Sequence, residues 1–450
     1  ATDVINLPLN EDCCYSKPLS VLACGVGDPR NVLLSLCNLS ETYEEELTFV
    51  LNDICACTLA RTVLILYILF KGGEDVASSV TQIWYSLRLN DKHYCLVISM
   101  LQELIEASNL DEPTKGTMQM NREQFQKLVE VWRTWLDLSS RQGDWITKAR
   151  NRGFTNFDDR KGMELYVEEL PKEHKASASD GFANGILLLE KSRKKLSREN
   201  FTLTSSDFLV NHNKSAFSYK IQSCILSFAG YSPSLLKMYS EYVNHVLKQS
   251  ALKLVTGRVK FHFLLSNCME IVRFVPPDHK YDCVTTSNIA DYVPLPSILD
   301  TYKPLLNLCN PFSVIITEFL NWPRYVNVKE KLMVRAFFMP KDESFRQKIF
   351  EDTKNSAIAF SESYQSFVEY HDHSDQFIQF LGAALLVSKF PHERNCRRIW
   401  KSVADYKGLV ARDFLRCQNR VFPAKWLLNW RRVSLLNGSE RAVEWIIYQS

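Results

Sequence analysis

The sequence predicts an α/β fold in which a parallel sheet is interrupted by a long helical insertion and followed by a mainly helical carboxyl-terminal region. Short runs of β-compatible residues occur before residue 55 and again after residue 257, and each run ends in a glycine-containing or polar turn. Helical periodicity fills the interval between them. We divide the chain at these changes into two sheet-forming parts, 1–70 and 256–325, the insertion 71–255 and the remainder 326–450.

A strand, a glycine turn and a helix start follow one another near the amino end. β-Compatible residues occupy 20–24, the turn contains Gly25 and Gly27, and Asp28 before Pro29 is a favourable N-cap and N1 pair. Glycine is needed where the backbone turns sharply or approaches a ligand without a Cβ. The first βα unit of nucleotide-binding folds has this order, so both glycines are candidate cofactor-binding residues.

A second strand is predicted over 47–51, and it ends at Asn52-Asp53. Asp53 follows the glycine turn by about 25 residues, near the separation at which a doubly wound fold places the carboxylate that binds ribose hydroxyls. The alternative is that Asp53 caps the helix that follows. The sequence leaves both roles open.

The helix expected over 54–70 is apolar except for Arg61. It is a little short for a bilayer, so we expect it to be buried within the protein and predict no transmembrane span. A buried arginine needs a carboxylate partner, and Asp28 or Asp53 is within reach. Arg61 would then be structural.

Helical patterns dominate the insertion. An apolar face predicts a helix over 121–138, where Asn121 and Gln124 have the spacing of an N-cap and its reciprocal partner. The polar segment 150–184 is predicted to be a loop and is a candidate lid. We expect the insertion to pack beside the strand ends and partly cover the cleft there.

Three further strands are predicted at 259–265, 282–286 and 313–317, with a helix over 296–306 between the last two. Each strand is followed by polar residues, the first by Ser266 and Asn267. Strand, polar tip, helix and strand is the order of a parallel sheet, and ligands bind at the carboxyl ends of such strands.

The tip that follows the strand 282–286 is the candidate site of any chemistry. Asn288, Asp291 and Tyr292 could orient an amino or hydroxyl acceptor, and they are the candidate catalytic residues. The alternative is that Asn288 and Asp291 satisfy backbone groups of the turn and that Tyr292 packs.

Several classes of function receive no support. The 54 basic and 51 acidic residues leave a net charge of +3, which gives no reason to expect nucleic acid or a membrane as partner. The 13 cysteines are scattered without a CxxC pair, so we expect reduced thiols of a cytosolic protein and no metal. The histidines of 370–375 and the basic run 191–198 are expected to be solvated. Tryptophans of the last region, such as Trp400 and Trp445, are expected mostly to close the core.

Three motifs together carry a resemblance to a known family. They are residues 24–31, residues 51–54 with 59–61, and residues 286–292. They resemble a domain-of-unknown-function family shared by fungal and invertebrate proteins, some joined to a MYND zinc finger, and by axonemal dynein assembly factor 3. The resemblance implies a Rossmann-like, class I methyltransferase-like core and a cytoplasmic location. For the dynein factor it also implies a role in preassembling dynein arms.

The resemblance also suggests S-adenosylmethionine as the cofactor. Asp53 and Asn267 occupy positions suited to ribose and adenine contacts. A working methyltransferase typically has an acid and a third glycine where this chain has Ala23 and Pro29. Alanine cannot bind the methionine ammonium, for which Asp28 is the substitute, and proline removes an N–H donor. Turnover is therefore not expected.

Two functions follow as expectations. The first is a cytoplasmic, methyltransferase-like factor for assembly or interaction, with protein partners and without turnover. The second is an active S-adenosylmethionine-dependent methyltransferase of unknown acceptor.

Overall fold

The computed structural model describes residues 15–141, 143–146, 148, 175–176, 198–205, 235–322, 325, 374–386, 405–412 and 441–447. The chain forms two compact units. The first comprises Ala1–Pro18 and Val26–Asn267, and the second comprises Leu19–Gly25 and Cys268–Ser450. All five predicted strands are present, three in the second unit and two in the first.

The sheet of the first unit has three parallel strands in the order β4 (Met118–Met120), β6 (Val259–Leu265) and β2 (Leu47–Asp53). β2 and β6 pair along their whole length, from Leu47 opposite Val259 to Asp53 opposite Leu265. Six of the seven residues of β2 are buried, as expected for a strand covered on both faces. The sequence did not predict β4, because Met-Gln-Met is short and has no β-branched residue.

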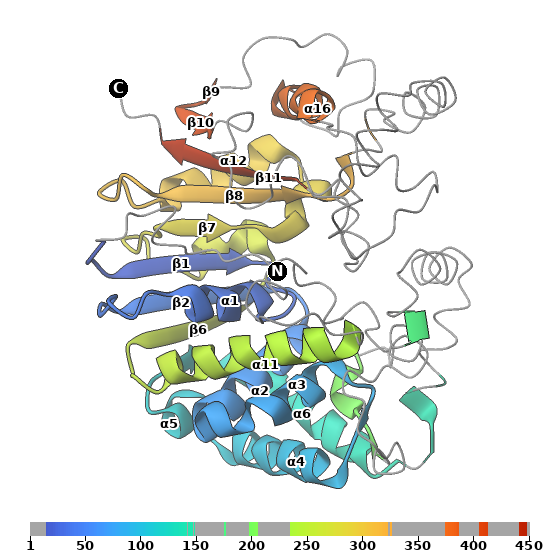
Figure 1. Ribbon diagram of the computed structural model, residues 1–450. Coiled ribbons are helices and arrows are strands. Elements are labelled where there is room, and N and C mark those ends of the chain that lie inside the picture. The colour runs from blue at the N-terminus through green and yellow to red at the C-terminus, as the bar shows by residue number, and fades with distance from the viewer. Residues whose placement is uncertain are drawn as a thin grey trace, which may run out of the picture. The chain divides into compact units, whose positions relative to one another are not determined.

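Helices make up most of the rest of the first unit, and α11 packs against α1 and α3 among them (Figure 1). The helical character predicted for the insertion is thus present, interrupted by β4 and by the short pair β3 and β5. The helices and the short pair are α1 (Arg30–Asn38), α2 (Ala56–Gly72), α3 (Ala77–Tyr85), α4 (Asp91–Glu106), α5 (Asp111–Thr114), α6 (Arg122–Ser139), α11 (Leu235–Leu254), the 3-10 helices η1 (Gly73–Val76) and η3 (Phe201–Leu203), β3 (Arg88–Leu89) and β5 (Arg198–Glu199).

α2 is the apolar helix that the sequence places inside the protein. Every residue from Leu59 to Leu69 is buried. Within the described residues, one stretch, Ala56–Tyr85, is long and apolar enough to cross a membrane, and 61% of its most apolar window is buried inside the protein. Such burial is typical of a core helix, which passes the same test of length and composition.

α6 confirms one half of its predicted capping pair and corrects the other. The Asn121 side chain accepts a hydrogen bond from the Glu123 N–H at 2.9 Å, as an N-cap does. Gln124 does not reach back to the cap. Its Oε1 accepts from the N–H of Leu265 at 3.0 Å, at the end of β6. The N–H at the end of a strand needs an acceptor, and the Gln124 side chain supplies it for Leu265. The sequence of the helix alone does not predict this contact.

The second unit has a mixed sheet in the order β1 (Leu19–Cys24), β7 (Cys283–Thr285), β8 (Val314–Phe319), β11 (Arg441–Ile447), β10 (Leu409–Ala411) and β9 (Asp405–Tyr406). β1, β7 and β8 are parallel, whereas β11 pairs with β8 antiparallel. The helical elements of this unit are η5 (Cys268–Arg273), η6 (Ser287–Asp291), α12 (Leu295–Tyr302), η7 (Lys303–Leu305) and α16 (Ser374–Leu386).

The carboxyl-terminal region 326–450 is expected to be mainly helical, and most of it lies outside the described residues. The residues described there form three strands, which were not predicted, and one helix. β11 is an inner strand whose first five residues are all buried, including Glu444, which pairs with Arg412 at 2.5 Å. Trp445 closes the core as predicted, and its Nε1 donates to Thr317 Oγ1 at 3.0 Å. The candidate lid apart from residues 175–176, the histidines of 370–375 and Trp400 lie outside the described residues.

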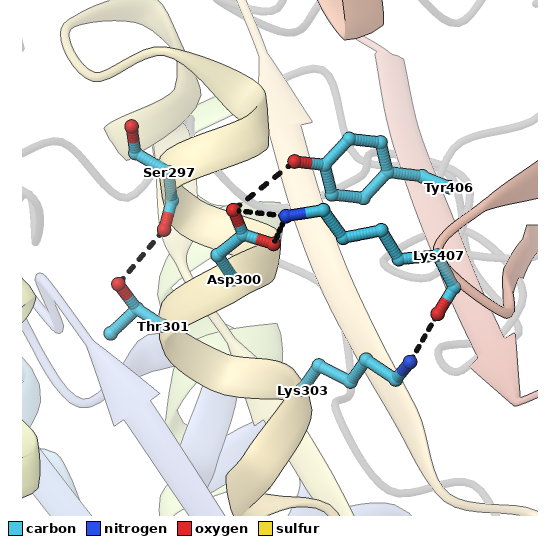
Figure 2. Close-up of polar contacts among 6 residues, drawn as sticks. All are labelled: Ser297, Asp300, Thr301, Lys303, Tyr406 and Lys407. Carbon is cyan, nitrogen blue, oxygen red and sulfur yellow. Dashed lines mark hydrogen bonds and ion pairs between the residues drawn. The ribbon is translucent and has the colours of Figure 1, made fainter.

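The β9–β10 hairpin is fastened to α12 by polar contacts at its tip (Figure 2). The two turn residues, Lys407 and Gly408, both have positive φ, at 51° and 80°, as a two-residue hairpin requires. Lys407 Nζ lies 2.8 Å from both carboxylate oxygens of Asp300, to which the Tyr406 hydroxyl donates at 3.2 Å. Lys303 donates to the Lys407 carbonyl. These groups are exposed, so each contributes little to stability.

Candidate functional site

The glycine turn of the first unit is held by the end of β2. Gly27 has φ +61°, and its N–H donates to Asp53 Oδ2 at 2.9 Å. The Val26 N–H donates to the Asn52 carbonyl at 2.9 Å. Asp53 Oδ1 accepts from the Cys55 N–H at 2.9 Å, and the side chain is buried, with 7% exposed. One carboxylate therefore joins the turn to the start of α2.

This geometry bears on the two roles predicted for Asp53. Its contact to the Cys55 N–H is the local turn expected if Asp53 organises the start of the next helix. The contact to Gly27, which no local pattern predicts, occupies the other oxygen. A ribose would have to share a buried carboxylate whose two oxygens already accept from backbone N–H groups. The arrangement is suited to stabilising the turn.

The N-cap of α1 is Pro29, one residue after the Asp28 predicted for that place, and it makes no side-chain capping hydrogen bond. Asp28 Oδ1 accepts from the Arg30 backbone N–H at 3.1 Å and from Arg30 Nε at 2.8 Å. The side chain is buried, with 5% exposed. One oxygen of the carboxylate predicted to meet a methionine ammonium is thus engaged by Arg30. Asn267, the candidate adenine contact, follows β6 and is exposed.

Asn52 is a site residue that the sequence analysis missed. It is fully buried, and its Nδ2 donates to the carbonyls of Leu264 and Ser266 and to Ser266 Oγ, at 2.9–3.1 Å. The side chain therefore bridges the carboxyl ends of β2 and β6. A polar residue in an otherwise apolar strand was the available signal.

Arg61 is buried, as predicted, but its hydrogen bonds within the described residues go to Ile83, Trp84 and Thr202 and not to the carboxylate expected as its partner. Burial lowers the pKa of its guanidinium to about 10, against the charge of Asp28, which raises it. Nη2 donates to the carbonyls of Ile83 and Trp84 at 3.2 and 2.5 Å, and Nε lies 3.5 Å from Thr202 Oγ1. Ile83 and Trp84 belong to the last turn of α3, so Arg61 supplies the positive charge and donors that a helix carboxyl end lacks.

The strand ends of the second unit carry the other candidates. Gly25 has φ +61°, and a Cβ there would lie 3.3 Å from Ile289 Cδ1, so η6 packs closely over this glycine. Asp291 is buried and accepts from the N–H groups of Leu320 and Asn321, both at 3.0 Å. This is the backbone-satisfying alternative considered for Asp291.

Asn288 and Tyr292 differ from Asp291 in their exposure. Asn288 is half-exposed, and its side chain makes no hydrogen bond to a described residue. Tyr292 is 68% exposed, which disagrees with the alternative that it only packs. Ser287, at the start of η6, has φ +47°, an uncommon conformation for a residue with a side chain. The catalytic roles of these residues stay predictions.

Among the residues that the structure describes, no three His, Cys, Asp or Glu side chains are grouped as a metal site would require. The predicted site residues form two sets. Gly27, Asp28 and Asp53 lie at the turn of the first unit, and Gly25, Asn288, Asp291 and Tyr292 lie at the strand ends of the second.

Removing the Asp53 carboxylate should destabilise the first unit. Asp53→Ala leaves the N–H groups of Gly27 and Cys55 without their acceptor, and we expect a loss of about 2–3 kcal/mol in the free energy of unfolding. Urea denaturation measures it. The matched control is Asp75→Ala, at an exposed carboxylate of η1, which should change stability by less than about 0.5 kcal/mol. Equal effects of the two substitutions would contradict the role given to Asp53.

Comparison with known proteins bears on the amino-terminal part of the chain. Residues 1–89 match a family model described as a domain of unknown function (DUF4470). The match includes two of the three motifs that carry the resemblance, together with the glycine turn, Asp53 and Arg61. No curated protein and no solved structure matches the chain. Residues 1–89 are therefore similar to a family of domains of unknown function.

Proposed function

We propose that this chain is a cytoplasmic assembly or interaction factor built on a methyltransferase-like core that has lost methyl transfer. The observation that carries the proposal is the burial and hydrogen bonding of the Asp53 carboxylate. In a cofactor-binding core this carboxylate must be available to ribose hydroxyls. Here it is buried, and its two oxygens accept from the N–H groups of Gly27 and Cys55.

The other residues assigned to S-adenosylmethionine do not fit it better. Pro29 stands at the position of the third glycine and has no N–H to offer. Asp28 is occupied by Arg30, and Ala23 has no group for an ammonium. Ile289 lies against Gly25, where the backbone would have to approach a ligand. We derive no methyl-transfer step from this arrangement.

The surface of the second unit favours a role in binding protein. Tyr292 and Leu320 are 68% and 39% exposed. They belong to neighbouring turns, since the carboxylate of Asp291 accepts from the Leu320 N–H. Exposed apolar side chains that lie together are typical of interaction sites. The resemblance to axonemal dynein assembly factor 3 suggests newly made dynein chains as the partner.

Titration calorimetry of the purified chain tests the loss of cofactor binding. With S-adenosylmethionine, and separately with its demethylated product, we expect no heat of binding at millimolar ligand. Binding that Asp53→Ala abolishes, accompanied by methylation of an extract that also depends on Asp53, would instead support the active methyltransferase. An established methyltransferase serves as the positive control for both measurements.

The partner is tested by translating an axonemal dynein heavy chain in a cell-free system that contains the purified chain. Co-purification should fall several-fold in the double variant Tyr292→Ser and Leu320→Ser, because serine removes apolar contact area. The matched control is Val255→Ser, at a residue of the first unit that is 59% exposed. If the double variant and the control recover as much heavy chain as the unchanged protein does, these side chains are not the binding surface.

A further inference from the structure

Two cysteines lie together at the start of α2. Cys55 is the N-cap residue, with the extended backbone φ −94° and ψ 113°, and Cys57 lies in the first helical turn. Neither forms a disulfide and both are partly accessible, as is every residue from Ile54 to Thr58. The helix behind them has 17 residues, so its amino end carries a full helix dipole.

Donors of the first turn of α2 surround Cys55, because Cys57 and Thr58 each bring a backbone N–H and a thiol or hydroxyl. Hydrogen bonding to these groups, with the Cys57 thiol contributing most, lowers the pKa of Cys55 to about 5 although partial burial acts to raise it. A thiolate, and not a thiol, is the nucleophile in disulfide exchange.

We propose that Cys55 and Cys57 form a thiol–disulfide exchange site for small disulfides, in which Cys55 is the attacking thiol and Cys57 the resolving thiol. Cys55 Sγ attacks one sulfur of a disulfide RSSR, forms a protein mixed disulfide and releases RS⁻. Cys57, after losing its proton to solvent, then attacks Cys55 Sγ, which forms an internal disulfide and releases the second RS⁻. The small disulfide is reduced to two thiols and the cysteine pair is oxidised, so the electrons balance.

The spacing of the pair permits this internal bond. Ala56 is helical, so the Cα atoms of residues 55 and 57 are about 5.4 Å apart, within the range of 4.4–6.8 Å that disulfides span. The charged group held at this turn is the Asp53 carboxylate, which accepts from the Cys55 N–H and from the Gly27 N–H. Exchange at Cys55 thus takes place on the segment that supports the glycine turn. The inference is independent of whether the chain binds a cofactor.

Three of the other described cysteines provide internal controls. Cys95 and Cys309 are exposed, more than Cys55 is, so accessibility alone would make them react first. Cys24 is buried beside Tyr302, and burial raises the pKa of its thiol above the usual range. It should not react in the folded protein.

Competitive alkylation followed by peptide mass spectrometry tests the nucleophile. The lowered pKa favours the thiolate of Cys55 at pH 6, and its weaker intrinsic nucleophilicity offsets part of this advantage. We expect Cys55 to react several-fold faster than Cys95 and Cys309 at pH 6, and to lose this advantage at pH 9. The same order of reaction at both pH values, with Cys95 first, would overturn the proposal.

Incubation with glutathione disulfide tests the division of roles. Intact-mass and peptide analysis should find an internal Cys55–Cys57 disulfide in the unchanged protein. Cys57→Ser should trap the mixed disulfide at residue 55, and Cys55→Ser should give neither product. Cys95→Ser is the matched control and should behave like the unchanged protein. Circular dichroism of each variant establishes that it is folded. A folded Cys57→Ser variant that forms no adduct would overturn the proposal.

Discussion

Replacing Arg61 by methionine should destabilise the first unit by about 3–5 kcal/mol. Methionine retains much of the apolar stem but removes the donors to the carbonyls of Ile83 and Trp84, which end α3 inside the protein. It also removes the positive charge that balances the buried Asp28. The free energy of unfolding from urea denaturation measures the loss, and hydrogen exchange in α3 should rise with it.

Arg30→Met is the matched control for this substitution. Arg30 also contacts Asp28, at 2.8 Å, but its side chain is 30% exposed, whereas Arg61 is buried. We expect a loss below about 1 kcal/mol. Arg61→Lys should recover only part of the stability, since an ammonium lacks the planar fork of a guanidinium. An Arg61→Met variant as stable as Arg30→Met would contradict the structural role of Arg61.

Replacing Trp445 by alanine should destabilise the second unit by about 3–5 kcal/mol. Trp445 is fully buried on β11, opposite Ile315 of β8, and its indole N–H donates to Thr317 Oγ1. Alanine leaves a large cavity and an unpaired hydroxyl in the sheet. Thermal and urea denaturation both measure the effect, which tests whether β11 is an integral strand of this unit.

Trp445→Phe separates packing from hydrogen bonding, because it keeps most of the ring volume and loses only the donor. We expect it to cost about 1–2 kcal/mol. Ile447→Ala, at the partly exposed end of β11, is the matched control and should cost less than Trp445→Ala. If Trp445→Ala is no more destabilising than Ile447→Ala, β11 does not contribute to the core as described.

The features that sequence reasoning predicted well are those that neighbouring residues determine. Gly25 and Gly27 both have the positive φ expected of the turn, Asp28 accepts from the Arg30 N–H at the start of α1, and Asn121 caps α6. Each depends on contacts within a few residues along the chain, so the pattern contains the cause. The five predicted strands are present for the same reason.

Strands without a strong local pattern were missed or assigned to helix. β4 has three residues and is a strand because β6 lies beside it. β11 follows a long segment rich in tryptophan and arginine, and its pairing with β8 joins residues more than 100 positions apart. Strand pairing of this kind depends on a distant partner, which one sequence does not identify.

The sequence by itself determined which residues form the turn, the strands that flank it and the apolar helix that follows. Only the tertiary structure decided what the polar residues there do. The sequence leaves open whether Asp53 caps a helix or binds a ribose, and in the structure its carboxylate also accepts from Gly27, which lies 26 positions away. A buried arginine requires acceptors or an opposite charge. Arg61 donates to a carbonyl at the end of α3, and the charge of Asp28 also favours its charged form. Buried polar groups must be satisfied by whatever the fold brings near, and that physical requirement acts through space and not along the chain.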